Sequence, residues 1–319
     1  MVKVIAEFCQ NHNGDYKILK EMIHQAAQNG ATYAKIQTIY AEDIAYRERF
    51  ELGQEKDGLV KSIKRPYQAE YDRLKKLELT FEQEALFIND CKEVGLIPMT
   101  TCFTRGSVNR LAEMDWKAIK IASYDCASLP LIKDISNKFE EMIISTGATY
   151  DQEIEAAANL LKETQTKFSF LHCVTIYPTP LNELHLNRML FLKQFSNNIG
   201  LSSHPLNEQD GVKADLAAIY LGAEYIERHF TILKPTESRD GPVSINSSNL
   251  KEIIDFSKLS KQDQKSYLTQ NVPEFEIMLG QEKRELSHQE LLNRDYYRGR
   301  FATHVNDQVI YNWEDKPIN

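Results

Sequence analysis

Eight short apolar runs, most of them separated by amphipathic helical stretches, constrain the fold of this chain more than any other feature of its sequence. Each run is rich in β-branched and aromatic residues, which is typical of a buried parallel strand. The predicted strands cover residues 2–7, 33–38, 97–103, 118–121, 142–145, 168–172, 199–202 and 225–229. The predicted helices cover residues 16–28, 81–94, 106–114, 151–164, 184–195 and 212–221.

This alternation of strands and helices requires right-handed crossovers and a parallel sheet. Eight such units over about 250 residues fit a closed (β/α)8 barrel best. An open doubly wound sheet is the alternative, but no GxGxxG fingerprint of its dinucleotide-binding version follows the first strand. We therefore predict an α/β protein, with a (β/α)8 TIM barrel over residues 1–280 and a short C-terminal arm over residues 281–319.

Charge and cysteine content limit the partners of the chain. The formal net charge of −8 argues against a nucleic-acid partner, although a few local lysines still suffice to hold an anionic small molecule. The five cysteines are widely spread and lack CxxC spacing, so we interpret them as reduced packing residues. No signal sequence and no apolar run of roughly 18 residues is present. These features predict a cytoplasmic protein without a membrane partner.

Two regions interrupt the alternation. Residues 39–67 form a long polar insertion after the second strand, and loops of this length in a compact domain usually serve as lids or mobile segments. Residues 281–319 are aromatic and charged and no longer alternate strand with helix. We expect this second region to be a short appendage on the barrel.

Polar side chains recur at or just after the ends of the predicted strands. In a closed barrel these strand ends meet at one mouth, where the active sites of this fold lie. Residues far apart in sequence are therefore expected to line one pocket. The strand-end residues are Glu7, Lys35, Gln37, Thr101, Lys120, Ser123, Ser145, His172, Ser202, His204, Glu227 and His229.

Two lysines in this set, Lys35 and Lys120, indicate an anionic substrate. An ammonium group inside a barrel is costly unless it is paired, and a bound carboxylate or phosphate supplies the pairing. Alternatively, the lysines pair with Glu7, Asp125 or Glu227 in a purely structural network. Suitable hydroxyl donors to a bound anion are those of Thr101, Ser123, Ser145 and Ser202.

Two histidines near the ends of neighbouring strands, His204 and His229, are candidate metal ligands. Neighbouring strands lie about 4.8 Å apart, so both imidazoles can reach one cation and leave open positions for water and substrate. Each histidine taken alone is more often a hydrogen-bonded core residue, as we expect for His12 and His172. The turn IYPTP holds Tyr177 between two prolines, either over the mouth or packed in a structural loop.

Eight motifs occur in a fixed order along the chain. They are AEFCQNHNGD (6–15), AKIQT (34–38), TTCFTR (100–105), IKIASYDC (119–126), STGA (145–148), LHCVTIYPTP (171–180), IGLSSHP (199–205) and IERHFT (226–231). Their order and spacing resemble those of the sialic acid synthases, the family that makes N-acetylneuraminate and other nonulosonic acids. The resemblance extends over residues 2–280.

This resemblance implies an Mn²⁺- or Mg²⁺-dependent condensation of phosphoenolpyruvate with an open-chain N-acyl hexosamine, giving a nine-carbon 3-deoxy-2-keto acid and phosphate. By matching positions, the implied catalytic residues are Glu7, Glu227 and Tyr177. The implied phosphoenolpyruvate subsite consists of Lys35, Thr101, Lys120, Ser123, Ser145, Thr175 and Ser202. The implied metal ligands are His204 and His229, and the implied sugar contacts are Gln37, Asp125, Tyr177 and Asp240.

Three departures from the family pattern affect these expectations. Thr175 stands where the family often has asparagine, and we expect phosphate binding to survive this change. The family motif GPD is GPV here, so Asp240 is expected to replace its aspartate from three residues upstream. Full-length members carry a C-terminal antifreeze-like domain that places an arginine over the partner's sugar. Residues 281–319 would be a remnant of that domain or a packed arm, with Arg298 and Arg300 as candidate replacements.

Two other functions remain open. A different metal-dependent barrel aldolase or keto-deoxy sugar acid synthase would use a phosphorylated sugar, and it would need a second cluster of arginines or lysines that the sequence does not place. A catalytically inactive barrel scaffold is the other alternative, although the intact strand-end residues argue against it. The sequence does not specify the sugar, the metal or the oligomeric state, and a homodimer through helix faces is compatible with it.

Overall fold

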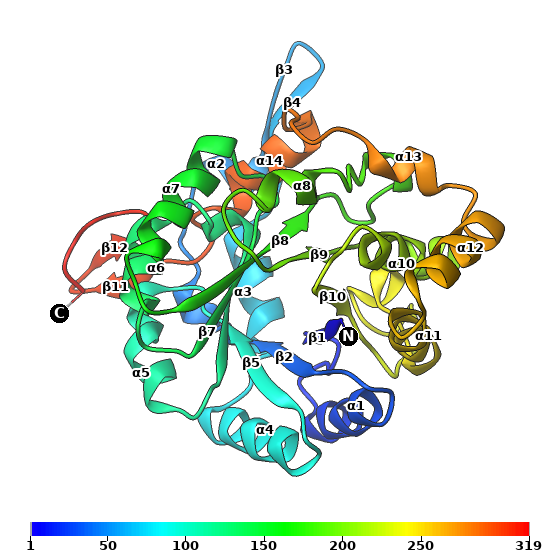
Figure 1. The fold of residues 1–319 in the computed structure, drawn as a ribbon. Coiled ribbons are helices and arrows are strands. Elements are labelled where there is room, and N and C mark those ends of the chain that lie inside the picture. Colours follow the sequence, from blue (N-terminus) through cyan, green and yellow to red (C-terminus); the bar gives the residue numbers. More distant parts are fainter. Residues whose placement is uncertain (1, 319) are drawn as a thin grey trace.

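Eight parallel strands close into a barrel in a computed structural model that describes residues 2–318 (Figure 1). The spatial order is β1-β10-β9-β8-β7-β6-β5-β2, and each predicted strand overlaps one of them. The predicted TIM barrel is therefore confirmed. Its strands are β1 (Lys3–Cys9), β2 (Tyr33–Gln37), β5 (Ile97–Thr101), β6 (Ala118–Ile121), β7 (Glu141–Ser145), β8 (Lys167–Cys173), β9 (Ile199–Ser202) and β10 (Tyr225–His229).

Helices surround this barrel and cover its outer face (Figure 1). Local signals define where several of them begin. The Asp15 side chain accepts a hydrogen bond from the Lys17 N–H at the start of α1, and Thr80 forms a capping box with Gln83 at the start of α4. The helices are α1 (Tyr16–Gln28), α4 (Phe81–Glu93), α5 (Val108–Glu113), α6 (Leu129–Ile135), α7 (Asp151–Lys162), α8 (Arg188–Leu192), α9 (Asn207–Asp210), α10 (Lys213–Tyr220), α11 (Ser247–Ser257), α12 (Lys261–Asn271) and α13 (Phe275–Leu279).

The helix predicted over residues 184–195 is wrong in its first turn. A short 3-10 turn covers Leu181–Glu183, and α8 begins only at Arg188. The intervening N–H groups of Leu186 and Asn187 donate to carbonyls of α13 at 2.9 Å, so a contact distant in sequence replaces the helical hydrogen bonds. The predicted helix 106–114 likewise begins as a 3-10 turn, Arg105–Ser107, before α5.

Inward-facing side chains of the barrel form two layers. The lower layer is apolar and consists of Ile5, Tyr33, Met99, Ala118, Ile143, Leu171 and Tyr225. Because side chains alternate between the two faces of a strand, the next inward position lies two residues further along. Those positions carry Glu7, Lys35, Thr101, Lys120, Ser145, Cys173 and Glu227. The apolar layer is thus a floor beneath a polar layer at the mouth.

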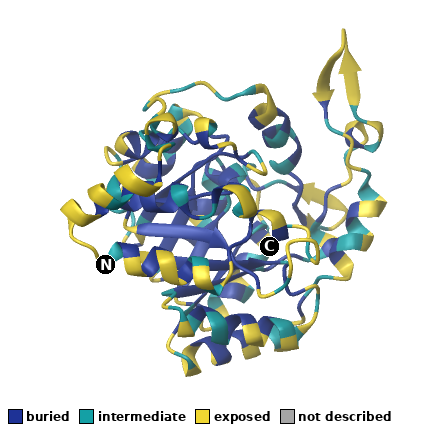
Figure 2. Cartoon of the chain, turned by 90° about the vertical axis from the view of Figure 1, so that its right-hand side faces the viewer, coloured by how far each residue is buried: buried dark blue, intermediate teal, exposed yellow. Residues whose placement is uncertain are grey.

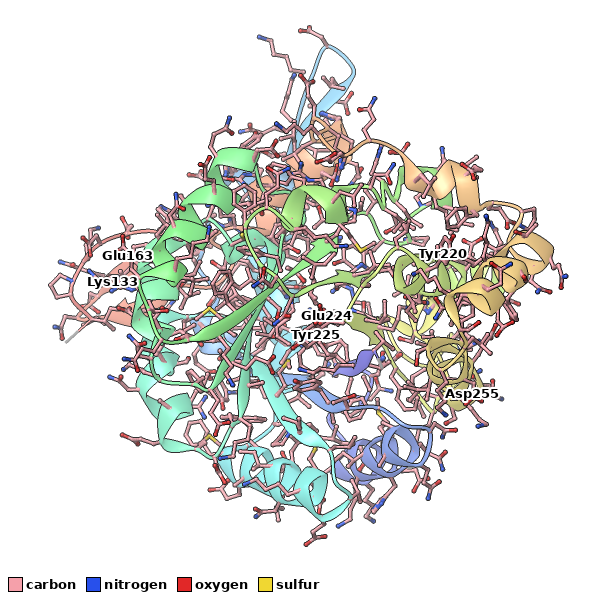
Figure 3. The ribbon with its side chains drawn as sticks, in the orientation of Figure 1. Lys133, Glu163, Tyr220, Glu224, Tyr225 and Asp255 are labelled. Atoms are coloured by element: carbon pink, nitrogen blue, oxygen red, sulfur yellow. The ribbon has the colours of Figure 1, made fainter. Side chains whose placement is uncertain are left out.

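Outward-facing side chains of the strands pack against the helices. Figure 2 shows the strands buried and the outer helix faces exposed. In Figure 3, the inward-facing Tyr225 is labelled near the barrel axis, and Asp255 of α11 is labelled in the outer helical layer. One outward residue is charged: Arg228 of β10 is fully buried and pairs with Asp215 of α10 at 2.9 Å.

The insertion after β2 has secondary structure of its own. It contains a 3-10 turn (Ala41–Asp43), α2 (Arg49–Leu52) and a hairpin of β3 (Gln54–Lys56) and β4 (Leu59–Ser62), and α3 (Tyr67–Lys75) follows it. The hairpin projects away from the barrel (Figures 1 and 2). At its base, Phe50 packs edge-on against Tyr296 with ring centroids 5.1 Å apart. The insertion is therefore fastened to the C-terminal arm.

The C-terminal arm lies against loops at the mouth of the barrel. It contains α14 (His288–Tyr297), β11 (Thr303–Val305) and β12 (Gln308–Ile310). Asn293 donates to the carbonyl of Thr175 just after β8, and the ring of Tyr297 stacks on Tyr124 just after β6. The boundary at residue 280 stays a prediction. No helix within residues 2–318 is both long and apolar enough to cross a membrane.

Candidate active site

A cavity of about 750 Å³ opens at the mouth of the barrel. This volume lies within the range of small-molecule sites. The predicted site residues that line it are Glu7, Lys35, Gln37, Thr101, Lys120, Ser123, Asp125, Ser145, Tyr177, Ser202, His204, Glu227, His229 and Asp240. Among the residues that the structure describes, Thr175 is the one predicted site residue outside the lining, and it is fully buried. The expected convergence on one pocket is therefore observed.

The two lysines face each other across Glu227. Lys35 Nζ lies 3.8 Å from one oxygen of this carboxylate and Lys120 Nζ lies 3.7 Å from the other. Lys35 also forms an ion pair with Glu7, its neighbour in the β1–β2 register. Both lysines thus have structural partners and still line the cavity, while Asp125 is not one of those partners.

Burial and charge set the ionisation of this network. Burial lowers the pKa of Lys35 to about 7. Burial by itself would raise the pKa of Glu227, but the charges of Lys120 and Lys35 outweigh it and the pKa is lowered. Glu227 is therefore a carboxylate that holds two amines near the barrel axis.

Hydroxyl groups surround the two lysines in the cavity. Lys35 donates to Thr101 Oγ1 at 3.1 Å, and Lys120 donates to Ser145 Oγ at 2.6 Å. The N–H of Gly147 donates to Ser123 Oγ at 3.2 Å. Ser202 Oγ instead donates to Glu227 at 2.8 Å, so its proton is engaged by the protein.

The predicted metal ligands lie side by side. The ring centroids of His204 and His229 are 5.2 Å apart, and within residues 2–318 neither Nδ1 atom has a hydrogen-bond partner. Burial lowers the pKa of both rings, so they are neutral imidazoles, the form that binds metal ions. Two buried and unpartnered imidazole nitrogens fit a divalent cation.

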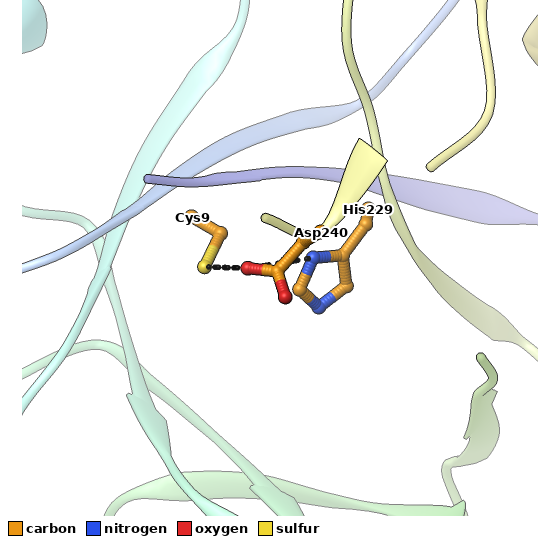
Figure 4. A group of neighbouring side chains, drawn as sticks. All are labelled: Cys9, His229 and Asp240. Carbon is orange, nitrogen blue, oxygen red and sulfur yellow. Dashed lines mark hydrogen bonds and ion pairs between the residues drawn. The ribbon is translucent and has the colours of Figure 1, made fainter. Parts of the chain in front are cut away.

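Two further side chains of the types that bind metal ions lie beside His229, as Figure 4 shows. Cys9 Sγ donates to Asp240 Oδ2 at 3.0 Å, and the same oxygen lies 4.0 Å from His229 Nδ1. One ligand atom from each of the three residues falls within 4.8 Å of the others. A thiolate, a carboxylate and an imidazole are all ligands of divalent transition metals.

The interpretation of the cysteines as packing residues leaves out the position of Cys9, which lines the cavity and donates to Asp240. The Cys9 φ of +47° lies in the left-handed region, at an irregularity in the β1–β2 pairing. Non-glycine residues rarely adopt this conformation, which is concentrated at functional sites. The available signal was its position at the end of the first strand, the same position that identified the other site residues.

Aromatic and acidic groups line the remaining wall. Tyr177 is half-exposed, and its ring lies 4.1 Å from that of His204, over the mouth as one of the two predictions had it. Asp125 accepts hydrogen bonds from Ser128 and from Asn312 of the arm, and burial raises its pKa to about 6. His172 turns outward and contacts the carbonyl of Leu184, so it is a core residue as expected.

Sequence reasoning missed a group of arginines in the outer part of the cavity. Arg65, Arg73, Arg239 and Arg300 line it. They come from the insertion, α3, the loop after β10 and the arm, and none lies at a strand end, so the strand-end pattern could not identify them. Arg298 is not in the lining; it lies 3.6 Å from Glu153.

Known proteins share this architecture. The NeuB family model matches residues 22–266. The N,N'-diacetyllegionaminic acid synthase of Campylobacter jejuni is 34% identical over 260 residues, covering 78% of this chain and 73% of that protein. The crystal structure of the Bacillus subtilis spore coat polysaccharide biosynthesis protein SpsE matches with a TM-score of 0.70 and 26% identity, covering 92% of this chain and 77% of that one. An N-acetylneuraminic acid synthetase of Leptospira borgpetersenii, solved with citrate, matches with a TM-score of 0.69 and 25% identity, covering 92% and 90%. This chain belongs to the NeuB family of nonulosonic acid synthases.

Proposed function

We propose that this enzyme condenses phosphoenolpyruvate with the aldehyde of an open-chain N-acyl hexosamine, giving a nine-carbon 3-deoxy-2-keto acid and phosphate. The observation that carries the proposal is one cavity lined by two amines, four carboxyl groups and two imidazoles whose Nδ1 atoms have no hydrogen-bond partner within the described residues. The amines suit an anionic donor substrate, and the imidazoles and carboxylates suit a metal ion that activates the acceptor. The names of the relatives, which are synthases of acidic sugars, support the same reaction class.

Phosphoenolpyruvate would bind over the polar layer at the base of the cavity. Its carboxylate would be held by Lys35, Thr101 and Ser123. Its phosphate would be held by Lys120, Ser145 and Ser202, which lie on β6, β7 and β9, and the Ser202 hydroxyl would turn from Glu227 to the phosphate. Thr175 would support this layer from behind, through its contact with Gly147. The two residues pack so closely that a Cβ added to Gly147 would lie 2.6 Å from the Thr175 methyl group.

A divalent cation would be held by His204 and His229, with Cys9 and Asp240 as additional ligands. When bound, it supplies Lewis-acid activation of the sugar aldehyde. Between the two metals that the family resemblance implies, the donor set favours Mn²⁺, because Mg²⁺ takes oxygen ligands and binds imidazole nitrogen poorly.

The reaction balances with the groups present. C3 of phosphoenolpyruvate bonds to the aldehyde carbon, whose oxygen takes a proton and becomes a hydroxyl. Water then bonds to C2, and the C2–O bond to phosphate breaks to leave a ketone and inorganic phosphate. Of the two protons of that water, one ends on the new hydroxyl and the other on the phosphate. Glu7 would accept a proton of that water, since within the described residues its Oε1 has no hydrogen-bond partner. Glu227 would hold the two lysines in place, and Gln37, Asp125, Tyr177 and Asp240 would contact the sugar.

The test is phosphate release from phosphoenolpyruvate with Mn²⁺ and a panel of N-acyl hexosamines, together with mass spectrometry of the product. We expect one acceptor to release phosphate and to yield a product heavier by the pyruvate unit. Phosphate release only with a sugar phosphate that lacks an amino group would favour a keto-deoxy sugar acid synthase. A complete absence of release with every acceptor would favour an inactive barrel.

A further inference from the structure

One carboxylate, that of Glu70, pairs with three arginines that line the cavity. Arg73 binds both oxygens of Glu70, at 3.0 and 2.9 Å. Arg300 forms an ion pair with the same group, and Arg239 lies 3.8 Å from it. The three guanidinium groups come from α3, the loop before the 3-10 turn Gly241–Val243 and the arm, so three separate segments converge on Glu70.

This cluster carries an excess of positive charge. Arginine stays protonated in proteins, and within the described residues Glu70 is the one carboxylate that pairs directly with these three guanidinium groups, so positive charge exceeds negative charge in these contacts. Arg65 adds a further positive charge to the cavity lining. Like charges gathered in a partly closed cavity attract an anion. The Arg300 side chain is 10% exposed, and in the described part of the chain its Nε has no hydrogen-bond partner. Such a donor is available to bind an oxygen of a ligand.

The cluster borders the metal-binding residues on the side away from the proposed phosphate subsite. Arg73 also donates to Gln10, the neighbour of Cys9, and Arg239 immediately precedes Asp240. In the barrel order, Cys9 on β1 and His229 on β10 lie next to each other, whereas Lys120 on β6 and Ser145 on β7 lie across the barrel. A sugar whose aldehyde is at the metal would therefore extend its far end toward the arginines.

We propose that the arginine cluster of Arg65, Arg73, Arg239 and Arg300 is a second anion site, which binds a phosphate or carboxylate group on the acceptor at the end remote from its aldehyde. The inference rests on the proposed function and specifies the acceptor as an anionic sugar. Guanidinium groups suit this role because their forked donors match the oxygens of phosphate and carboxylate.

Acceptor kinetics test the inference. The probes are N-acetylmannosamine, its 6-phosphate and its 6-carboxylate, each with saturating phosphoenolpyruvate and Mn²⁺. We expect a charged sugar to have a kcat/KM at least about tenfold above that of the neutral sugar, as charged hydrogen bonds usually provide. The 6-phosphate and 6-carboxylate arms identify which anion the site takes.

Two variants locate the effect. Arg239→Gln and Arg65→Gln should each raise KM for the charged sugar about tenfold and shrink its advantage over the neutral sugar, while KM for phosphoenolpyruvate stays unchanged. Arg49→Gln is the matched control, because Arg49 is similarly exposed and pairs with Asp295 outside the cavity lining. If the two cavity variants raised KM for phosphoenolpyruvate and not KM for the sugar, the cluster would bind phosphoenolpyruvate, and the inference would be overturned.

Direct binding separates this inference from the reaction itself. Calorimetric titration of the 6-phosphate and 6-carboxylate sugars into the Mn²⁺-loaded protein, without phosphoenolpyruvate, should show binding that Arg239→Gln weakens. Such binding without any turnover would sink the proposed reaction and leave the anion site standing. Efficient turnover of the neutral sugar, with no gain from either charge, would leave the reaction standing and overturn the anion site, as would the failure of both charged sugars to bind or react.

Discussion

Cys9 Sγ donates a hydrogen bond to Asp240 Oδ2 across a sequence separation of 231 residues. The bond joins the end of the first barrel strand to the loop after the last one, beside His229. A thiol, a carboxylate and an imidazole can replace water molecules as ligands of a metal ion. The thiol must first lose its proton. Under the proposed function, this relationship extends the metal-ligand set beyond a pair of histidines.

A cobalt spectrum tests whether Cys9 is a ligand. The protein loaded with Co²⁺ should show a thiolate-to-cobalt charge-transfer absorption, because a metal-bound cysteine is a thiolate. Cys9→Ala should lose this absorption and bind Co²⁺ at least about tenfold more weakly, while still binding through its imidazoles. Cys91→Ala, which removes a buried thiol from the helix layer, is the control. An unchanged spectrum in Cys9→Ala would exclude the thiol from the site.

Histidine substitutions should separate metal binding from stability. His229→Ala should abolish metal-dependent turnover and weaken metal binding while the melting temperature stays close to that of the parent, since a side chain at the mouth contributes little to the packed core. His172→Ala should do the opposite. It removes a buried contact to the carbonyl of Leu184, which should cost about 1–3 kcal/mol of unfolding free energy but leave metal affinity unchanged. Wild-type rates of His229→Ala at limiting metal would refute the metal assignment.

Loss of one buried amine should weaken the donor complex. Lys120→Ala should raise KM for phosphoenolpyruvate roughly tenfold or more, because it removes a charge-assisted contact from an enclosed subsite. Lys117→Ala is suitable for comparison, since this neighbouring lysine is half-exposed and pairs with Asp115 on the surface. An unchanged KM for phosphoenolpyruvate in Lys120→Ala would remove this residue from the anion site.

The ionisation of Glu70 should appear in acid unfolding. Burial would raise its pKa, but the hydrogen bond from Arg73 and the charge of Arg300 lower the pKa from 4.5 to about 2. A carboxyl whose pKa is depressed by folding contributes stability that is complete above pH 4.5 and is lost as the pH falls toward 2. The contribution at neutral pH is of the order of 3 kcal/mol. Denaturant unfolding of the parent and of Glu70→Gln should therefore differ most near neutral pH and converge near pH 2, whereas a constant difference would contradict the assignment.

The sequence predicted the barrel and most of the site because both depend on local patterns. Period-two alternation fixes which strand residues face inward, and a closed barrel brings the ends of all strands together. That logic placed Lys35, Lys120 and Glu227 correctly without knowledge of their contacts. Cys9 fits the same positional rule. It was predicted to be a packing residue because the spacing of the cysteines, and not the position of Cys9 at a strand end, was used.

The outer part of the site could not be predicted in this way. Arg73 lies on a helix after an irregular insertion, and Arg300 lies on an arm whose course across the mouth depends on tertiary contacts such as that of Asn293 with Thr175. The helix predicted over residues 184–195 lacks its first turn for the same reason. The N–H groups there donate to carbonyls of α13, which is distant in sequence. Contacts between segments distant in sequence leave no periodic signal.

The apolar floor beneath the polar layer has a kinetic consequence for the proposed reaction. Tyr33, Met99 and Tyr225 close the barrel below Lys35 and Lys120, so both reactants would have to pass through the same opening. The donor, seated at the base, would then have to load first, and a sugar bridging the metal and the arginines would seal it in until carbon–carbon bond formation. The enzyme would thus follow compulsory-order kinetics, with the sugar alone forming a dead-end complex at high concentration.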